Sequence, residues 1–294
     1  MRRLKLILII VLSTVLVITI AGGIFVLTLN VKSKRIGNVD IEVKNDQDGE
    51  IEIGKEYTAL TYNIGFGAYD RDYSFFMDEG VMNDGTKTKG KYGKAVSKEN
   101  VLKNTNGSIE ILKSVNADFM MLEEVDTKST RSYKVNQYEM ITSTFNNYSI
   151  SYASNFHSGY LPYPLNDMHG TVNSGLLTMS RFNMKESKRI ELPVETKFPT
   201  KFFDLDRCLN LIRYKVGEKD LVMITAHLSA YDEGGVYRQK QLLLLNELMS
   251  EEYSKGNYVI VGGDFNHDLV NSYERGLFKS EQQLPEWLQI LNND

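Results

Sequence analysis

Four short apolar runs in this chain each end abruptly at a polar side chain, and this pattern limits the folds that the chain can adopt. The runs and the residues that close them are 58–62 before Asn63, 119–123 before Glu124, 221–226 before His227, and 258–263 before Asp264. Short runs rich in β-branched and aromatic residues, bounded by polar residues or glycine, are typical of buried β-strands. The polar residues would lie at strand ends, where a sheet can hold them together. Hydrolysis of a phosphoester at a divalent metal requires such a cluster, so the pattern favours an enzyme.

The N-terminal part of the chain predicts a membrane anchor. Residues 6–31 contain no charged residue, and the basic residues of positions 1–5 precede them. A helix over these 26 residues would be about 39 Å long, which is enough to cross a hydrocarbon core of roughly 30 Å with some tilt. About 250 of the 294 residues follow this segment. That length fits one large domain.

A cleaved secretory signal is the alternative to a retained anchor, because small residues at 21–23 could form a cleavage site. The apolar run continues past these residues to position 31, which favours retention. Three Lys or Arg residues lie on each side of the span, so the distribution of positive charge gives no orientation. The short basic start favours a cytoplasmic N-terminus. We therefore expect a single-pass protein of the cell membrane with an extracytoplasmic domain.

The charge of the domain bears on its substrate. Positions 1–35 hold six basic residues and no acidic ones, which leaves 28 basic against 38 acidic residues and a net charge of −10. A protein that grips a long polyanion usually carries a basic face. The charge therefore weakens the case for long duplex nucleic acid without excluding it. The single cysteine, Cys208, rules out an internal disulfide framework, and we expect it to be buried and inert.

The remaining elements follow from periodicity and turn residues. We expect a linker with an edge strand over 32–56 and a long loop over 64–98. Helices are expected over 100–115 and 236–252, and short strands near 148–153 and 175–179. Strands 208–216 and 221–227 should form a hairpin. Apolar residues at helical spacing support the helices. The glycine turn at 217–219 supports the hairpin.

Five motifs in this order resemble the endonuclease/exonuclease/phosphatase superfamily. They are Leu60-Thr-Tyr-Asn63, Leu122-Glu-Glu124-Val, Ser174-Gly-Leu-Leu-Thr-Met-Ser-Arg181, Thr225-Ala-His227-Leu and Gly263-Asp-Phe-Asn266. Each motif alone is weak, but together they cover roughly 57–269 in the family order. The resemblance implies an α+β fold, a four-layer α/β/β/α sandwich of two packed mixed or antiparallel sheets. This domain would occupy 57–294.

The resemblance also implies roles for the strand-end residues. Glu124 would be a ligand of Mg²⁺ or Mn²⁺, and Asn63 would hold the metal or its carboxylate ligand. Asp264 would contact the attacking water, and Asn266 would orient the phosphate. His227 would donate to a phosphoryl oxygen and stabilise charge in the transition state.

Three further residues are candidates for contact with the substrate. Arg131 and Tyr133 follow Glu124 closely and could bind phosphate, and Asn173 precedes the third motif. For each of them a role in a solvated loop or turn is the alternative. The family usually has Gln at the position of Glu123, whose side chain would face away from that of Glu124 on a regular strand.

The chain departs from the family pattern near its end. The family's last motif, Ser-Asp-His, has no counterpart after Asp268, so we expect a domain that is incomplete at its C-terminus. The predicted function is divalent-metal-dependent hydrolysis of phosphodiesters at the membrane, acting on nucleic acid, on phospholipid or on a small phosphoester. No obligate protein partner is implied. The alternative is a catalytically inactive, membrane-tethered protein that binds a phosphorylated ligand.

Overall fold

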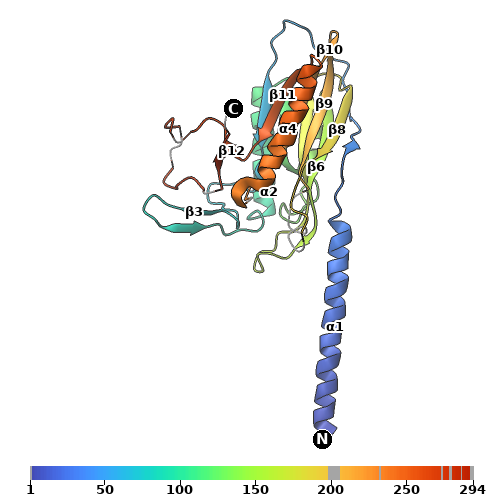
Figure 1. Cartoon of the computed structure of the whole chain (residues 1–294), viewed down its shortest axis with the longest axis vertical. Helices are drawn as coiled ribbons and strands as arrows, with labels where there is room; N and C mark the ends of the chain where they lie inside the picture. Colours follow the sequence, from blue (N-terminus) through green and yellow to red (C-terminus); the bar gives the residue numbers. More distant parts are fainter. Residues whose placement is uncertain are drawn as a thin grey trace.

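The N-terminal helix stands away from the rest of the molecule in the computed structural model (Figure 1). The structure describes residues 2–197, 206–231, 233–272, 274–277, 280–285 and 287–291. Helix α1 (Arg2–Lys32) is long and apolar enough to cross a membrane, although a signal sequence near the N-terminus would have the same properties. Its side chains are exposed except for Leu29, which is 8% exposed.

The first sheet has the strand order β2-β5-β7-β6. Its strands are β2 (Ala59–Asn63), β5 (Phe119–Asp126), β6 (Ser149–Leu161) and β7 (Gly170–Ser180). Strands β2 and β5 are parallel, and the other pairs are antiparallel. Strands β6 and β7 are much longer than the short strands expected from the sequence. Register shifts at Ser154/Phe156 and Ser158/Leu161 let β6 continue where its pattern becomes irregular.

The second sheet has the order β1-β8-β9-β10-β11. Its strands are β1 (Val39–Asp40), β8 (Glu186–Glu191), β9 (Cys208–Val216), β10 (Lys219–His227) and β11 (Tyr258–Asp264). The predicted hairpin is β9 and β10, which turn at Gly217 in the left-handed region. Only the β10–β11 pair of this sheet is parallel.

The side chains of each strand alternate between two apolar layers, as a half-buried pleat requires. Phe119 and Met121 of β5 pack between the sheets with Tyr214 and Met223 of the second sheet. The intervening Met120 packs outwards, in one cluster with α2 (Lys98–Val115) and α3 (Gln137–Thr144). On the second sheet, the outer face of β9 and β10 packs against α4 (Val236–Ser254). The four-layer α/β/β/α sandwich with an apolar N-terminal helix is therefore confirmed.

Smaller elements surround one end of the sandwich. The stretch 64–98, expected to be a loop, contains the 3₁₀ turn η1 (Gly65–Gly67) and the hairpin of β3 (Glu79–Val81) and β4 (Lys87–Lys89). A second 3₁₀ turn, η3 (Glu233–Gly235), precedes α4, and the short strands β12 (His267–Asp268) and β13 (Gln289–Ile290) pair near the C-terminus. Cys208 is fully buried, and burial raises the pKa of its thiol to about 12.

Candidate active site

Four strand ends from the two sheets meet at one end of the sandwich. Register places Asn63 of β2 beside Glu123 of β5, and His227 of β10 beside Asp264 of β11. Because both pairs are parallel, the two strands of each pair have their carboxyl ends at the same edge of their sheet. The side chains of Asn63, Glu124, His227 and Asp264 all line one cavity of about 920 Å³. The structure thus brings together the four strand-end residues that the sequence singled out.

Asn63 links the acidic residues of the two sheets. Its Nδ2 donates to Glu124 Oε1 at 3.2 Å and to Asp264 Oδ2 at 3.0 Å. Its Oδ1 accepts the backbone N–H of Gly65 at 2.9 Å. Both polar atoms of the amide are therefore engaged: the nitrogen contacts one carboxylate from each sheet, and the oxygen accepts from the backbone.

An irregularity of β5 directs Glu124 into the cavity. The register with β7 shifts between Leu122 and Val125, and Glu124 has a φ of 56°. Glu124 keeps 23% of its side chain exposed, whereas Glu123 is 1% exposed and accepts from Thr61 Oγ1 at 3.1 Å, outside the cavity. Burial raises the pKa of both carboxyls. The two neighbouring glutamates therefore have different environments, and only Glu124 is accessible to a ligand.

Arg131 stands behind Glu124 and is itself held by Asp126. Its Nε and Nη2 donate to the two oxygens of Asp126 at 3.1 and 2.8 Å, while its Nη1 lies 3.6 Å from Glu124 Oε2. The guanidinium also covers the ring of Phe66 at 4.0 Å. Arg131 lines the cavity but is only 4% exposed. Its charge opposes the rise in the pKa of Glu124 caused by burial.

Glycine makes room for the Asp264 motif. A Cβ on Gly263, which has a φ of 141°, would lie 1.9 Å from the carbonyl oxygen of Ala226. Asp264 Oδ1 accepts the N–H of Asn266, and Asn266 Nδ2 donates to Leu228 O at 2.8 Å. Burial alone would raise the pKa of Asp264, but the hydrogen bonds that it accepts from Asn63 and from the backbone N–H of Asn266 help to lower this pKa. Asp264 therefore stays a carboxylate.

His227 is a neutral imidazole in this environment. It is 5% exposed, and its Nε2 lies 3.8 Å from Asp264 Oδ2. Burial lowers the pKa of His227, as does the guanidinium of Arg207, whose Nη1 donates to the His227 carbonyl at 3.1 Å. A neutral ring offers one N–H donor and one acceptor nitrogen.

Two of the predicted substrate-binding residues lie apart from this cluster. Tyr133 is 36% exposed, and its hydroxyl donates to Val96 O. Asn173 is exposed and donates to Lys128 O at 3.4 Å. Side chains alternate along β7, so its neighbour Ser174 lines the cavity and Asn173 points away from it. Neither residue is among those that line the cavity.

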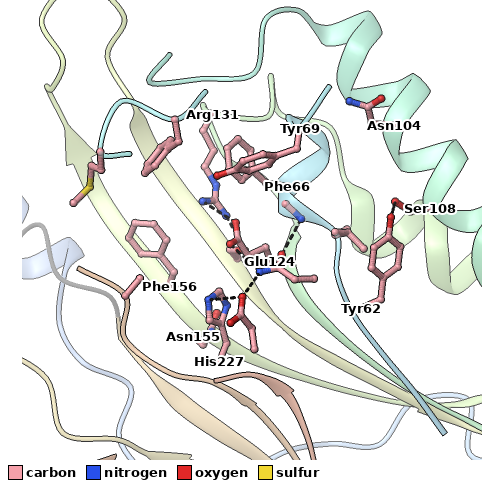
Figure 2. Close-up of a pocket in the computed structure, with 18 of the residues that line it drawn as sticks. Tyr62, Phe66, Tyr69, Asn104, Ser108, Glu124, Arg131, Asn155, Phe156 and His227 are labelled. Atoms are coloured by element: carbon pink, nitrogen blue, oxygen red, sulfur yellow. Dashed lines mark hydrogen bonds and ion pairs between the residues drawn. The ribbon is translucent and has the colours of Figure 1, made fainter. Parts of the chain in front are cut away.

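The structure adds residues that the sequence did not indicate. Asn155 of β6 lines the same cavity as His227 (Figure 2) and is 3% exposed, yet its Nδ2 has no hydrogen-bond partner among the described residues. Aromatic residues, among them Phe66, Tyr69 and Phe156, also line the cavity. His169 also lines the cavity, and burial together with Arg131 lowers its pKa to about 4. A polar residue inside a long strand was the only available signal for Asn155.

The donor set fits a small, hard divalent cation. Mg²⁺ prefers oxygen ligands and usually keeps several waters beside one or two carboxylates. Glu124 and Asp264 are two carboxylates that contact one amide, and the raised pKa of Glu124 means that its charge is poorly compensated. Within the described ranges, no three His, Cys, Asp or Glu side chains are grouped to hold a metal, so any ion here would keep water ligands.

Comparison with known proteins places this geometry in context. A family model described as "Endonuclease/Exonuclease/phosphatase family" matches residues 60–275. Searching the curated proteins found no match. Similar solved structures include D. rerio TDP2 complexed with a single-strand DNA product, with 15% identity and a TM-score of 0.47, covering 75% of this chain and 64% of that one.

Two further similar structures are the human Nocturnin catalytic domain with bound sulfate and ANGEL2, a 2',3'-cyclic phosphatase. Nocturnin has 19% identity and a TM-score of 0.42, covering 56% of this chain and 57% of that one. ANGEL2 has 14% identity and a TM-score of 0.43, covering 80% and 57%. The chain thus spans less than two thirds of the length of these three structures.

Proposed function

Because this chain belongs to the endonuclease/exonuclease/phosphatase family, we propose that it is a membrane-anchored hydrolase of phosphodiester bonds that depends on Mg²⁺ or Mn²⁺. The observation that carries the proposal is the junction at Asn63, whose amide contacts one carboxylate from each sheet. These groups line a cavity with an incompletely compensated glutamate, a neutral histidine and a buried amide donor that has no partner in the described part of the chain.

Each residue of the junction has a role that its contacts support. Glu124 and Asn63 would hold the metal ion, which would neutralise charge on the phosphoryl oxygens. Asp264 remains a carboxylate and would accept a hydrogen bond from the attacking water. The N–H of neutral His227 would donate to a phosphoryl oxygen, and stabilisation of this kind increases as charge develops.

Asn266 and Arg131 would support these groups from the side. One N–H of Asn266 Nδ2 is used by Leu228 O, and an amide has two such donors. The second would orient the phosphate. Arg131 is held by Asp126 and would keep Glu124 in place. Contact between the substrate and Tyr133 or Asn173 would require movement of the turn that carries Tyr133 or of this part of β7.

The test of this proposal is an assay of the purified full-length protein. Bis-para-nitrophenyl phosphate, a single-stranded oligonucleotide and a phospholipid would be offered with Mg²⁺, with Mn²⁺ and with EDTA. We expect metal-dependent release of product from at least one substrate. Binding of metal without turnover of any of them would contradict the proposal and favour the inactive, ligand-binding alternative.

The membrane topology is a separate part of the proposal. We expect α1 to be retained and the domain to be extracytoplasmic. External protease added to intact cells should then digest the domain while a cytoplasmic control protein survives. Protection of the domain until lysis would show the opposite orientation, and a soluble, shortened product would show cleavage of a signal sequence.

A further inference from the structure

The end of α1 rests directly on the sheet that carries the site. The N–H of Gly159 on β6 donates to Ser33 Oγ at 3.4 Å, just after the end of α1. A Cβ on Gly159 would lie 2.9 Å from Lys32 Cβ and 3.3 Å from Leu29 Cδ2. The missing side chain therefore allows helix and strand to touch, and no flexible spacer separates the last turn of α1 from the domain.

This contact lies at the same end of the sandwich as the active site. Register places Phe156 of β6 beside Ser174 of β7, and Ser174 beside Asp126 of β5. Strands β5 and β6 run in the same direction, because each is antiparallel to β7. Gly159 is three residues further along, which is about 10 Å beyond the level of the site. Figure 1 shows α1 leaving the domain from this end.

The length of α1 sets the height of this end above a membrane. The uncharged stretch 6–31 is about 39 Å long as a helix, whereas the hydrocarbon core is roughly 30 Å thick. The boundary of the core on the domain side thus falls within the last turns of α1, where Leu29 meets Gly159. With α1 spanning the membrane as proposed above, the carboxyl end of β6 would lie at the level of the lipid headgroups.

The loop between β6 and β7 adds an apolar surface at this end. Tyr163 and Leu165 are 53% and 76% exposed, and tyrosine favours the interface of a membrane. The loop is fixed in place, because Asp167 accepts the N–H of Gly93 at 2.8 Å and pairs with Lys94 at 3.1 Å. The ring of Tyr163 lies 5.4 Å from that of Phe76, which lines the cavity.

We propose that the substrate of this site is the phosphodiester of a lipid headgroup in the leaflet on which the domain sits. The proposal rests on the proposed phosphodiesterase function and names its substrate class. The net charge of −10 outside the anchor region and the apolar wall of Phe66, Met77, Phe156 and Leu161 suit a lipid better than a long polyanion. In the reaction, the oxygen of water bonds to phosphorus and one ester P–O bond breaks. The leaving oxygen takes a proton, so that an alcohol and a phosphomonoester are formed.

The experiment compares lipid and soluble substrates for the same full-length protein. The protein is reconstituted into vesicles of phosphatidylcholine and phosphatidylglycerol, and release of phosphomonoester or alcohol is measured. Bis-para-nitrophenyl phosphate and a single-stranded oligonucleotide are assayed in the same preparation. Turnover of the vesicle lipid at least tenfold faster than that of either soluble substrate is the expected result.

A spacer variant tests whether height above the membrane matters. Residues 35–37 are bound to the domain, for example through Arg35 Nη2 to Leu192 O at 2.8 Å and Ile36 N–H to Asp206 at 3.1 Å. A Gly-Ser insert of about ten residues between Lys34 and Arg35 would span about 18 Å and detach the domain from α1. Lipid turnover should fall at least tenfold while hydrolysis of the soluble diester is unchanged.

Matched controls separate this effect from damage to the fold. The same insert between Gly217 and Glu218, in the turn at the other end of the sandwich, should leave both rates unchanged. Leu165→Ser should lower the ratio of lipid to soluble turnover several-fold. Leu243→Ser, an equally simple change at an exposed residue of α4, should leave this ratio unchanged.

The outcomes distinguish this inference from the proposed function. If the protein hydrolyses the oligonucleotide or the soluble diester as fast as the vesicle lipid, or if the spacer leaves lipid turnover intact, the lipid assignment is wrong while the phosphodiesterase function stands. Failure to hydrolyse any of the three substrates overturns both.

Discussion

Glu124 and Glu252 are carboxylates at opposite ends of the sandwich, and their partners differ. Glu252 accepts from Arg213 Nη1 and Nη2 at 2.7 and 3.1 Å, from Lys255 at 2.9 Å and from Asn257 at 2.8 Å. Glu124 has one amide contact, from Asn63 at 3.2 Å, and a guanidinium nitrogen at 3.6 Å. Hydrogen bonds, that from Arg213 foremost, lower the pKa of Glu252 to about 2, whereas burial raises the pKa of Glu124.

The difference separates a group that supports the fold from one that is available to a ligand. The charge of Glu252 is fully compensated by its neighbours. The charge of Glu124 is not, and the same end of the molecule holds the buried His169 and Asn155, whose Nδ2 has no partner within the described ranges. Groups with uncompensated charge or hydrogen-bonding capacity tend to gather at functional sites, so the two ends should respond differently to substitution.

The largest expected effect is on activity. Glu124→Gln should lower kcat/KM at least a thousandfold, about 4 kcal/mol, because it removes the anionic oxygen that would bind metal, and it should leave the fold intact. Glu123→Gln is the matched control: burial holds the pKa of Glu123 well above its usual range, so the neutral amide should retain activity within a few-fold. Steady-state kinetics with Mg²⁺ and circular dichroism check both variants. Equal losses in the two variants would remove the distinction between these neighbours.

At the other end the main effect should be on stability. Glu252→Ala should lower the free energy of unfolding by about 2 kcal/mol, because the partly buried Arg213 loses its bidentate partner, while kcat of the folded protein is unchanged. Glu251→Ala, which removes an exposed ion pair with Lys255, should cost only a few tenths of a kcal/mol. Urea unfolding measures both. A loss of activity in folded Glu252→Ala protein would contradict the comparison.

His169 should make the site end sensitive to acid. Its pKa is about 4 when folded and about 6.5 when unfolded, so the unfolded state binds the proton more tightly. Stability is then lost as the pH falls from about 6.5 towards 4. This loss amounts to about 2 kcal/mol of unfolding free energy between pH 7 and pH 5. His169→Gln should unfold in urea with a smaller difference between these two pH values. An unchanged difference would show that His169 does not carry this effect.

The smallest expected effect concerns Asn155. Asn155→Leu should lower kcat about tenfold, about 1.4 kcal/mol, if Nδ2 donates to the phosphoryl group, and it should not destabilise the protein because that atom has no partner among the described residues. Asn210 is a buried contrast, since its amide bonds Ser151 and Thr178 between the sheets. Asn210→Leu should therefore lower stability. A destabilised but fully active Asn155→Leu protein would reverse the assignment.

Much of the architecture follows from local sequence. Apolar runs ending in polar residues predicted β2, β5, β10 and β11 and the convergence of Asn63, Glu124, His227 and Asp264, because strands in register must end together. The glycine turn at 217–219 predicted the hairpin of β9 and β10, and the resemblance of the five motifs predicted the four-layer sandwich. These features depend on period and order along the chain, which a single sequence displays.

Other features depend on contacts between distant segments. Arg131 follows Glu124 by seven residues, which suggested a contact with phosphate, but two of its nitrogens bind Asp126 and a third lies near Glu124. Asn155 lies in a part of β6 whose pattern is interrupted by register shifts. Nothing in the local sequence indicates that this residue lines the same cavity as His227, since that depends on how the two sheets pack.

Cys208 offers a direct way to measure how the domain sits on a bilayer. It is the single cysteine of the chain, and it is fully buried with a thiol that stays protonated near neutral pH. Thiolate is the reactive form, so labelling reagents should pass over it. A cysteine introduced at position 165 would then accept a nitroxide spin label selectively, and its relaxation by oxygen and by a nickel chelate would report immersion depth without first removing the native thiol.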